Sequence, residues 1–218
     1  YNSNAELGIG TTGNYYTPIL QKDYHNDWPL SGKTIAKLCR GYHTNSVITD
    51  EGDVYVWGDG NQGQLLSGNS NDSGVPRKID YFSGRILIRD VCWGYSHALA
   101  ISDNGQMYTW GYNGHGQRGI GSTSYNSSNT TPSLIVRDNA GNSLIGVVFH
   151  KIEAGYHQCM ALRQDNGQLY TWGYGGDGGL CHGNTSSYYY PKIVNDQDNW
   201  GSPIKKMKMR YYGAVSYT

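Results

Sequence analysis

The stretch that decides the fold is Gly94-Tyr-Ser-His-Ala-Leu-Ala-Ile-Ser-Asp-Asn-Gly-Gln-Met-Tyr-Thr-Trp-Gly111. Asp103-Asn-Gly105 separates two short apolar runs, and a Gly in that place supplies the positive φ that a tight hairpin turn needs. In the second run Tyr108 and Trp110 are two residues apart, so they share one face of a strand and their neighbours take the other. A strand that is apolar on both faces is sandwiched between layers. The stretch therefore predicts a buried antiparallel hairpin.

The same pattern occurs twice more, in Gly41–Gly58 and Gly155–Gly173. Each copy ends in Trp-Gly, continues into a Gly-rich stretch and reaches a Pro before a short apolar run. A Pro fits the first position of an outer or edge strand, because its missing N–H costs no ladder hydrogen bond there. The prolines in this place are Pro18, Pro76, Pro132 and Pro191.

The two ends of the chain also match parts of the repeat. Residues 1–10 align with 112–121, and residues 207–218 align with 152–163. We therefore expect one continuous segment, 1–218, that begins and ends inside a repeat, with its remaining units supplied by the same polypeptide or by another chain. The expected unit parts are 1–40, 41–93, 94–154, 155–209 and the start of a further unit, 210–218.

Four short strands in each unit, with a central strand covered on both faces, are typical of a β-propeller blade that stacks on its neighbours. A Trp that recurs once per unit is most simply the residue packed between blades. We therefore predict an all-β propeller fold with equivalent inter-blade positions for Trp57, Trp110 and Trp172.

These motifs, G-x-x-H followed by D-x-G-x-V/L-Y-x-W-G and G-Q-L/R-G-x-G, resemble the repeat of the regulator of chromosome condensation family over essentially the whole chain. The resemblance implies a seven-bladed β-propeller, of which about four units are visible here as a partial ring. Family members include exchange factors, photoreceptors, inhibitors and scaffolds, so the resemblance implies fold more firmly than activity. Light-sensing members carry Trp where this chain has Tyr, which disfavours photoreception.

Composition limits the partners. The chain has 218 residues, 31 Gly and 20 Tyr, with 17 basic and 17 acidic residues. This neutral balance disfavours a nucleic-acid surface, and the basic run at 205–210 is better explained as a solvated strand edge. No apolar run reaches the length of a membrane helix, so we expect no membrane insertion.

The residues that could carry chemistry do not form a recognisable motif. The four Cys lack zinc-ligand spacing, so no metal or cofactor is expected, and whether Cys39 and Cys92 pair stays open. Ser96, His97 and Asp103 could be drawn as a triad, but nothing marks a nucleophile elbow. His43, His97 and His157 recur near the start of the second strand of their units, where a structural hydrogen bond is the simpler role.

We therefore predict a non-enzyme: a protein-interaction or structural scaffold within a larger assembly. Its partners would be other proteins, or further copies of itself that complete the propeller. Guanine nucleotide exchange on a small GTPase, the activity of the founding family member, is a less favoured alternative, because no stretch could be assigned to an exchange-factor wedge.

A tyrosine recurs once per unit directly after the first strand. If the blades radiate from an axis, these residues form an arc near the central opening, where rigid aromatic area and a hydroxyl suit protein contact. Packing between blades is an equally good explanation of the same pattern. The arc comprises Tyr42, Tyr95, Tyr156 and Tyr211.

A second candidate surface is the variable loop between the Gly-rich stretch and the Pro, which holds every N-x-S/T sequon of the chain. If the protein is secreted, glycans would decorate one rim, and a secreted or cell-surface structural glycoprotein, a filament or coat, becomes the alternative function. A cytoplasmic or cytoskeletal location is slightly favoured, with only polar loops at these positions. The sequons begin at Asn71, Asn126, Asn129 and Asn184.

Overall fold

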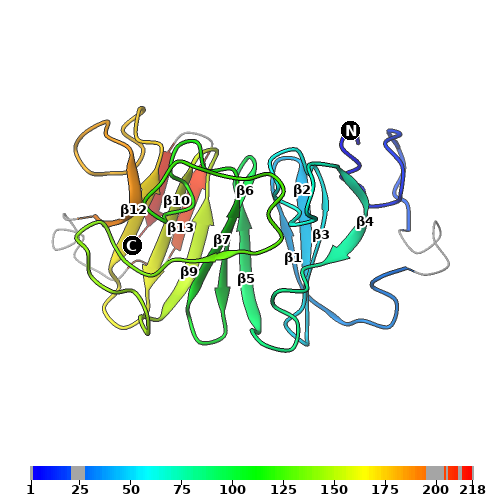
Figure 1. Ribbon diagram of the computed structural model, residues 1–218, viewed down its shortest axis with the longest axis horizontal. Helices are drawn as coiled ribbons and strands as arrows, with labels where there is room; N and C mark the ends of the chain where they lie inside the picture. The colour runs from blue at the N-terminus through cyan, green and yellow to red at the C-terminus, as the bar shows by residue number, and fades with distance from the viewer. Residues whose placement is uncertain (1, 21–27, 195–203, 205, 211–212, 218) are drawn as a thin grey trace.

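The computed structural model describes residues 2–20, 28–194, 204, 206–210 and 213–217, and these contain strands and turns but no helix. Three four-stranded antiparallel sheets stand side by side along the long axis, and a two-stranded sheet follows them (Figure 1). Each sheet is a simple meander, because its strands pair in chain order. The predicted all-β antiparallel architecture is confirmed.

The strand bounds follow the repeat. The first sheet holds β1 (Ile35–Arg40), β2 (Thr44–Thr49), β3 (Val54–Gly58) and β4 (Ser73–Lys78). The second holds β5 (Ile88–Trp93), β6 (His97–Ser102), β7 (Met107–Gly111) and β8 (Ser133–Leu134). The third holds β9 (Phe149–Ala154), β10 (Gln158–Arg163), β11 (Leu169–Gly173) and β12 (Tyr188–Ile193), and the last pair is β13 (Lys206–Arg210) and β14 (Gly213–Tyr217).

The sequence repeat is offset from the sheets by one strand. The unit 41–93 carries β2, β3 and β4 of one sheet and β5 of the next, and the unit 94–154 is divided in the same way. The first strands of successive sheets lie against each other, β1 with β5, β5 with β9 and β9 with β13. Each unit therefore joins two neighbouring sheets covalently.

The glycine after each repeated Trp is required by a close backbone approach. Gly111 has φ +86°, and a Cβ built on it would lie 2.5 Å from the Ser96 carbonyl oxygen. Gly58 and Gly173 repeat this geometry, with φ +104° and +98°. A Cβ built on Gly58 would lie 2.2 Å from the His43 carbonyl oxygen, and one built on Gly173 would lie 2.3 Å from the His157 carbonyl oxygen. The Trp-Gly pair of the repeat thus couples a buried indole to a position where only Gly fits.

The apolar cores lie between the sheets. Every residue of β3, β7 and β11 is buried. One cluster joins the first and second sheets through side chains such as Val56, Trp93 and Trp110, and another joins the second and third sheets through Leu99 and Phe149. Burial of this kind makes the stacking of neighbouring sheets the main source of stability.

Each repeated indole also reaches back to the preceding unit. The Nε1–H of Trp110 donates to the Gln64 carbonyl oxygen at 2.8 Å, and that of Trp172 donates to the Gln117 carbonyl oxygen at 2.9 Å. Trp57 donates to the Glu6 carbonyl oxygen at 2.8 Å. Each of the three tryptophans is thus hydrogen-bonded to the Gly-rich stretch one unit earlier. Trp110 and Trp172 lie in cores shared by two sheets, whereas Trp57 lies in a smaller cluster beside an open pocket.

Three smaller expectations can be compared with the structure. Pro76 and Pro191 lie within the edge strands β4 and β12, so the edge assignment is right but the first position is wrong for them. Cys39 and Cys92 are both free thiols. The described residues include no helix that could cross a membrane.

Candidate protein-interaction site

The site begins with a tight turn after the first strand of each sheet. The Gly41 N–H donates to the Thr44 carbonyl oxygen at 2.7 Å, and the Gly94 N–H donates to the His97 carbonyl oxygen at 2.8 Å. A Cβ on Gly94 would lie 2.6 Å from the Gly155 carbonyl oxygen in the next sheet. Glycine therefore lets the turns of neighbouring sheets touch, and the residue that follows each glycine is brought close to its counterpart.

Those following residues are tyrosines, and we call Tyr42, Tyr95 and Tyr156 the tyrosine row. The ring centroids of Tyr42 and Tyr95 are 5.0 Å apart, and those of Tyr95 and Tyr156 are 4.4 Å apart. The Tyr95 N–H also donates to the Tyr156 carbonyl oxygen at 3.2 Å. Tyr42 is 56% exposed, and the other two are half-buried. The predicted fourth member, Tyr211, lies outside the described residues.

Histidines stand beside the row at both ends. His43 Nδ1 lies 2.8 Å from Glu6 Oε1, and its ring packs edge-on against Tyr42. His157 lies next to Tyr156, and burial together with the neighbouring His115 lowers its pKa to about 4. The His157 ring is therefore neutral at physiological pH.

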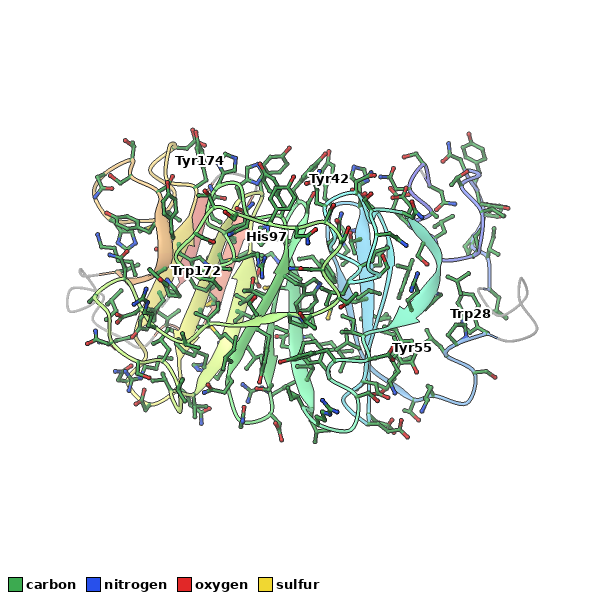
Figure 2. The ribbon with its side chains drawn as sticks, in the orientation of Figure 1. Trp28, Tyr42, Tyr55, His97, Trp172 and Tyr174 are labelled. Atoms are coloured by element: carbon green, nitrogen blue, oxygen red, sulfur yellow. The ribbon has the colours of Figure 1, made fainter. Side chains whose placement is uncertain are left out.

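An open pocket of about 480 Å³ adjoins the last tyrosine of the row. Its lining combines the turn after β9 with the loops that follow β7 and β11. We call it the aromatic pocket, and it is lined by His115, Tyr156, His157, Gln158, Tyr174 and Asp177. Figure 2 shows Tyr42 and Tyr174 at the same edge of the sheets.

The loop half of this pocket is not among the residues predicted from the sequence. His115 and Asp177 occupy the same place in two Gly-rich loops, three residues after Tyr112 and Tyr174, which in turn follow the Trp-Gly pairs. The glycines of these loops indicate turns and give no sign of a binding site. The recurring Tyr after Trp-Gly was the signal that could have pointed to this pocket.

His97 serves the interior. It is fully buried, its Nε2 lies 3.2 Å from Cys159 Sγ, and burial lowers its pKa to about 3. Cys159 Sγ in turn donates to the Gln117 carbonyl oxygen at 3.4 Å, and burial raises the pKa of this thiol. The pair links β6 to β10 rather than presenting a reactive group to solvent.

The triad that could be drawn from the sequence does not assemble. Ser96 and His97 lie at the start of β6, whereas Asp103 lies in the turn after its end. A strand of this length separates them by about 20 Å, far beyond hydrogen-bond distance. Within the described part of the chain, no group of three or more His, Cys, Asp or Glu side chains could hold a metal ion.

The sequons lie in equivalent loops that join the third and fourth strands of each sheet, β3 to β4, β7 to β8 and β11 to β12. These loops start at the same edge as the tyrosine row but run to the outermost strand. Asn71, Asn126 and Asn184 are exposed, and Asn129 is half-buried.

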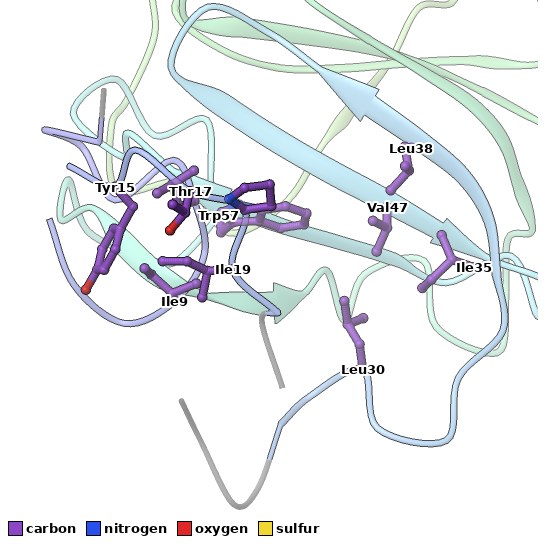
Figure 3. Close-up of a pocket in the computed structure, with 11 residues that line it drawn as sticks. Ile9, Tyr15, Thr17, Ile19, Leu30, Ile35, Leu38, Val47 and Trp57 are labelled. Atoms are coloured by element: carbon purple, nitrogen blue, oxygen red, sulfur yellow. The ribbon is translucent and has the colours of Figure 1, made fainter. Parts of the chain in front are cut away.

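The outer face of the first sheet is apolar and open. Leu38 is 78% exposed, whereas Val91 and Ile152, which hold the same register position in β5 and β9, are 3% and 4% exposed because the preceding sheet covers them. Leu38, Ile35 and Trp57 line an apolar pocket of about 460 Å³ on this side (Figure 3). We call this uncovered side of the first sheet, with Leu38, Ile35 and Trp57, the open face.

The family model of the regulator of chromosome condensation (RCC1) repeat matches residues 51–101, 104–162 and 166–208. The chain belongs to the RCC1 repeat family. This confirms the resemblance found in the sequence. Each RCC1 match starts in the hairpin turn between the second and third strands of one sheet, and the first two matches end in the second strand of the next sheet, β6 and β10. The family repeat is therefore offset from the sheets by two strands, one more than the units described above.

Curated relatives of this RCC1-repeat chain include much longer proteins. It is 33% identical to the E3 ubiquitin-protein ligase HERC2 of Homo sapiens over 165 residues, which are 75% of this chain and 3% of HERC2. It is 30% identical to the ultraviolet-B receptor UVR8 of Arabidopsis thaliana over 195 residues, which are 89% of this chain and 40% of UVR8. The chain thus spans less than half of either relative.

Solved structures confirm the propeller fold of this RCC1-repeat chain. Human WBSCR16 superposes with a TM-score of 0.81 at 19% identity over 100% of this chain and 52% of that one. Prp20p from Saccharomyces cerevisiae, described together with its binding to Gsp1p and histones, gives 0.72 at 16% identity over 99% of this chain and 49% of that one. The three sheets and the final strand pair are accordingly part of an RCC1-type propeller.

Proposed function

We propose that this chain is the non-catalytic, protein-binding part of a larger propeller assembly, and that it contacts its partner through the tyrosine row. One observation carries the proposal. Rings from successive sheets meet in a continuous row at one edge, with centroids 5.0 and 4.4 Å apart. Partly exposed tyrosines on rigid turns offer contact area with little loss of side-chain freedom, which favours protein recognition.

The positions of the potentially reactive side chains also support a non-catalytic role. His97 and Cys159 are buried against each other away from solvent, and Ser96 and Asp103 lie at opposite ends of a strand, so neither set forms an accessible catalytic group. Among the solved relatives, yeast RCC1 (Prp20) has been crystallised bound to Kap60, a protein. Protein binding is therefore the function we assign to this edge of the sheets.

The test is site-specific crosslinking in the full-length protein in its own cells. A photoreactive phenylalanine replaces Tyr42 or Tyr95 in one set and Leu87 in the control, since Leu87 is 50% exposed and packs against Gly52 in the hairpin turn at the other edge. We expect Tyr42 and Tyr95 to capture the same protein and Leu87 not to. Capture of unrelated proteins, or the same capture from Leu87, would exclude the row as a specific surface.

The open face supports the second part of the proposal. In the two following sheets the equivalent position is buried by a neighbouring sheet, whereas Leu38 is bare. Exposed apolar area of this kind is a typical contact surface. We propose that another blade, from the same polypeptide or a further copy, covers the open face in the complete assembly.

A structural glycoprotein remains the second candidate, because the exposed Asn71, Asn126 and Asn184 stand in equivalent loops. N-linked glycosylation requires an accessible sequon and the secretory pathway. Intact-mass and glycopeptide spectrometry of protein from its native source distinguishes the candidates. Hexose on these asparagines would favour the extracellular function, and bare asparagines would favour an intracellular scaffold.

A further inference from the structure

We propose that the aromatic pocket binds a lysine or arginine side chain of the protein partner. The inference rests on the proposed function, because the pocket shares Tyr156 with the tyrosine row and extends the same contact surface. The juxtaposition is that of a cation-binding cage, with aromatic rings around an open volume and one carboxylate at the edge.

The rings are close enough to act together. The His115 and His157 centroids are 4.4 Å apart, those of Tyr156 and His157 are 4.3 Å apart, and those of His115 and Tyr174 are 5.2 Å apart. A cation held within about 6 Å of the Tyr156 or Tyr174 face is attracted by the ring quadrupole. Because these rings come from three separate segments, they form walls of a pocket rather than one flat stack.

The lining of the pocket holds an acidic side chain. Asp177 is exposed and supplies a carboxylate, and the described lining includes no Lys or Arg. His157 adds no positive charge at neutral pH, because burial and His115 hold its pKa at about 4. A cationic side chain is therefore complementary to the pocket, whereas an anionic one would meet a carboxylate of like charge.

The histidine of the turn has a loop partner in both the first and the third sheet, but only in the first sheet is that partner acidic. There His43 contacts Glu6 at 2.8 Å, and Glu6 corresponds to Gln117 because residues 1–10 align with 112–121. In the third sheet His157 has Gln117 Nε2 at 3.4 Å, and Asp177 stands across an open volume. The exposed carboxylate is thus left available to a ligand from outside.

The experiment compares two small probes that differ in charge and little in shape. Tyr174 is replaced by 4-fluorophenylalanine in the full-length protein, and its ¹⁹F resonance is followed during titration with N-acetylarginine amide or with the neutral N-acetylcitrulline amide. We expect a saturable shift with the arginine probe and none with the citrulline probe. Equal shifts with both, or no shift up to the solubility limit of the arginine probe, would overturn the proposal.

Variants identify the groups responsible. Asp177→Asn is expected to weaken arginine binding about fivefold, the upper range for an exposed ion pair, and Asp50→Asn in the hairpin turn at the other edge should leave it unchanged. Two further variants change Tyr174 itself, so the fluorine label is moved to Tyr156. Tyr174→Leu should weaken arginine binding about threefold, and Tyr174→Phe should leave arginine binding unchanged. Unchanged binding in Asp177→Asn or in Tyr174→Leu would show that the pocket is not the site.

The outcomes separate this inference from the proposed function. Crosslinking at Tyr42 and Tyr95 does not involve Asp177 or Tyr174. If that crosslinking captures one partner but the arginine probe does not bind, the interaction surface stands and the cationic pocket is wrong. If the probe binds but no common partner is captured, the pocket stands and the tyrosine row is wrong.

Discussion

His97 illustrates how one position carries different residues for a local reason. Thr44 and Gln158 hold the same register position in the neighbouring sheets, and all three side chains are buried. Only His97 meets a buried thiol, that of Cys159. The histidine is thus a titratable group placed in an interior that disfavours its charged form.

Acid should therefore destabilise the protein through His97. The unfolded chain takes up a proton at this residue near pH 6.5, whereas folded His97 does so only near pH 3. Its contribution to stability is complete above pH 6.5 and declines as the pH falls toward 3, by at most about 1.4 kcal/mol per pH unit.

Urea unfolding at several pH values measures this effect. His97→Gln introduces the residue that the third sheet already carries at this position, and it should flatten the slope of unfolding free energy between pH 6 and about 4. The histidine would be excluded as the cause if the variant and the parent protein had identical slopes.

At the scale of elements, the sequence predicts the hairpins because their determinants are local. Gly52, Gly105 and Gly167 all have positive φ in the expected turns, and Tyr108 and Trp110 alternate as a strand requires. Which strands pair within one sheet is harder to predict from the sequence. The repeat gives the length of a unit but does not show where one sheet ends and the next begins. Hydrogen bonds between β5 and β6 cross the boundary between two units at residues 93 and 94.

The tyrosine row could be predicted from the sequence, whereas the aromatic pocket could not. Three of the four predicted tyrosines are described, and they lie in one row, because a single residue type recurs at a single structural position. Whether the row binds a partner stays a prediction. The aromatic pocket depends on which loops meet across two sheets, and side chains as far apart in sequence as His115 and Tyr174 gave no local signal of that contact.

The close approach at the Trp-Gly pair can be tested with two matched glycines. Gly111 and Gly141 have nearly equal φ, +86° and +89°, but a Cβ would meet the Ser96 carbonyl oxygen at 2.5 Å only at Gly111, with nothing within 4 Å at Gly141. Gly141→Ala should cost about 1 kcal/mol for backbone strain alone, and Gly111→Ala at least about 2 kcal/mol more.

Equilibrium denaturation of both variants provides the comparison. Equal losses of unfolding free energy would mean that the backbone relaxes around the added methyl group, and that the glycine of the Trp-Gly pair is retained for its dihedral angle only.

At the scale of the whole molecule, stability comes from stacking, and a bare sheet face is the exception. In the complete assembly we expect a blade to cover Leu38, so Leu38→Asp should lower the stability of the full-length protein by about 2 kcal/mol or more, because a carboxylate would replace buried apolar area. The same substitution in the 218-residue chain should be nearly neutral, since Leu38 is 78% exposed there.

Ile145→Asp is the control, because Ile145 is 64% exposed outside the sheets and should tolerate the charge in both proteins. Thermal unfolding and light scattering report stability and assembly together. A full-length protein that tolerates Leu38→Asp as well as Ile145→Asp would leave the open face exposed to solvent in the native assembly.

The offset between repeat and sheet also bears on how such a chain can change its size during evolution. Each unit carries the last three strands of one sheet and the first strand of the next. A tandem duplication of one unit-length gene segment therefore adds one whole sheet wherever its breakpoints fall, since the copy upstream supplies the missing first strand. Recombination within this gene can lengthen or shorten the stack by entire blades without ever cutting at a blade boundary.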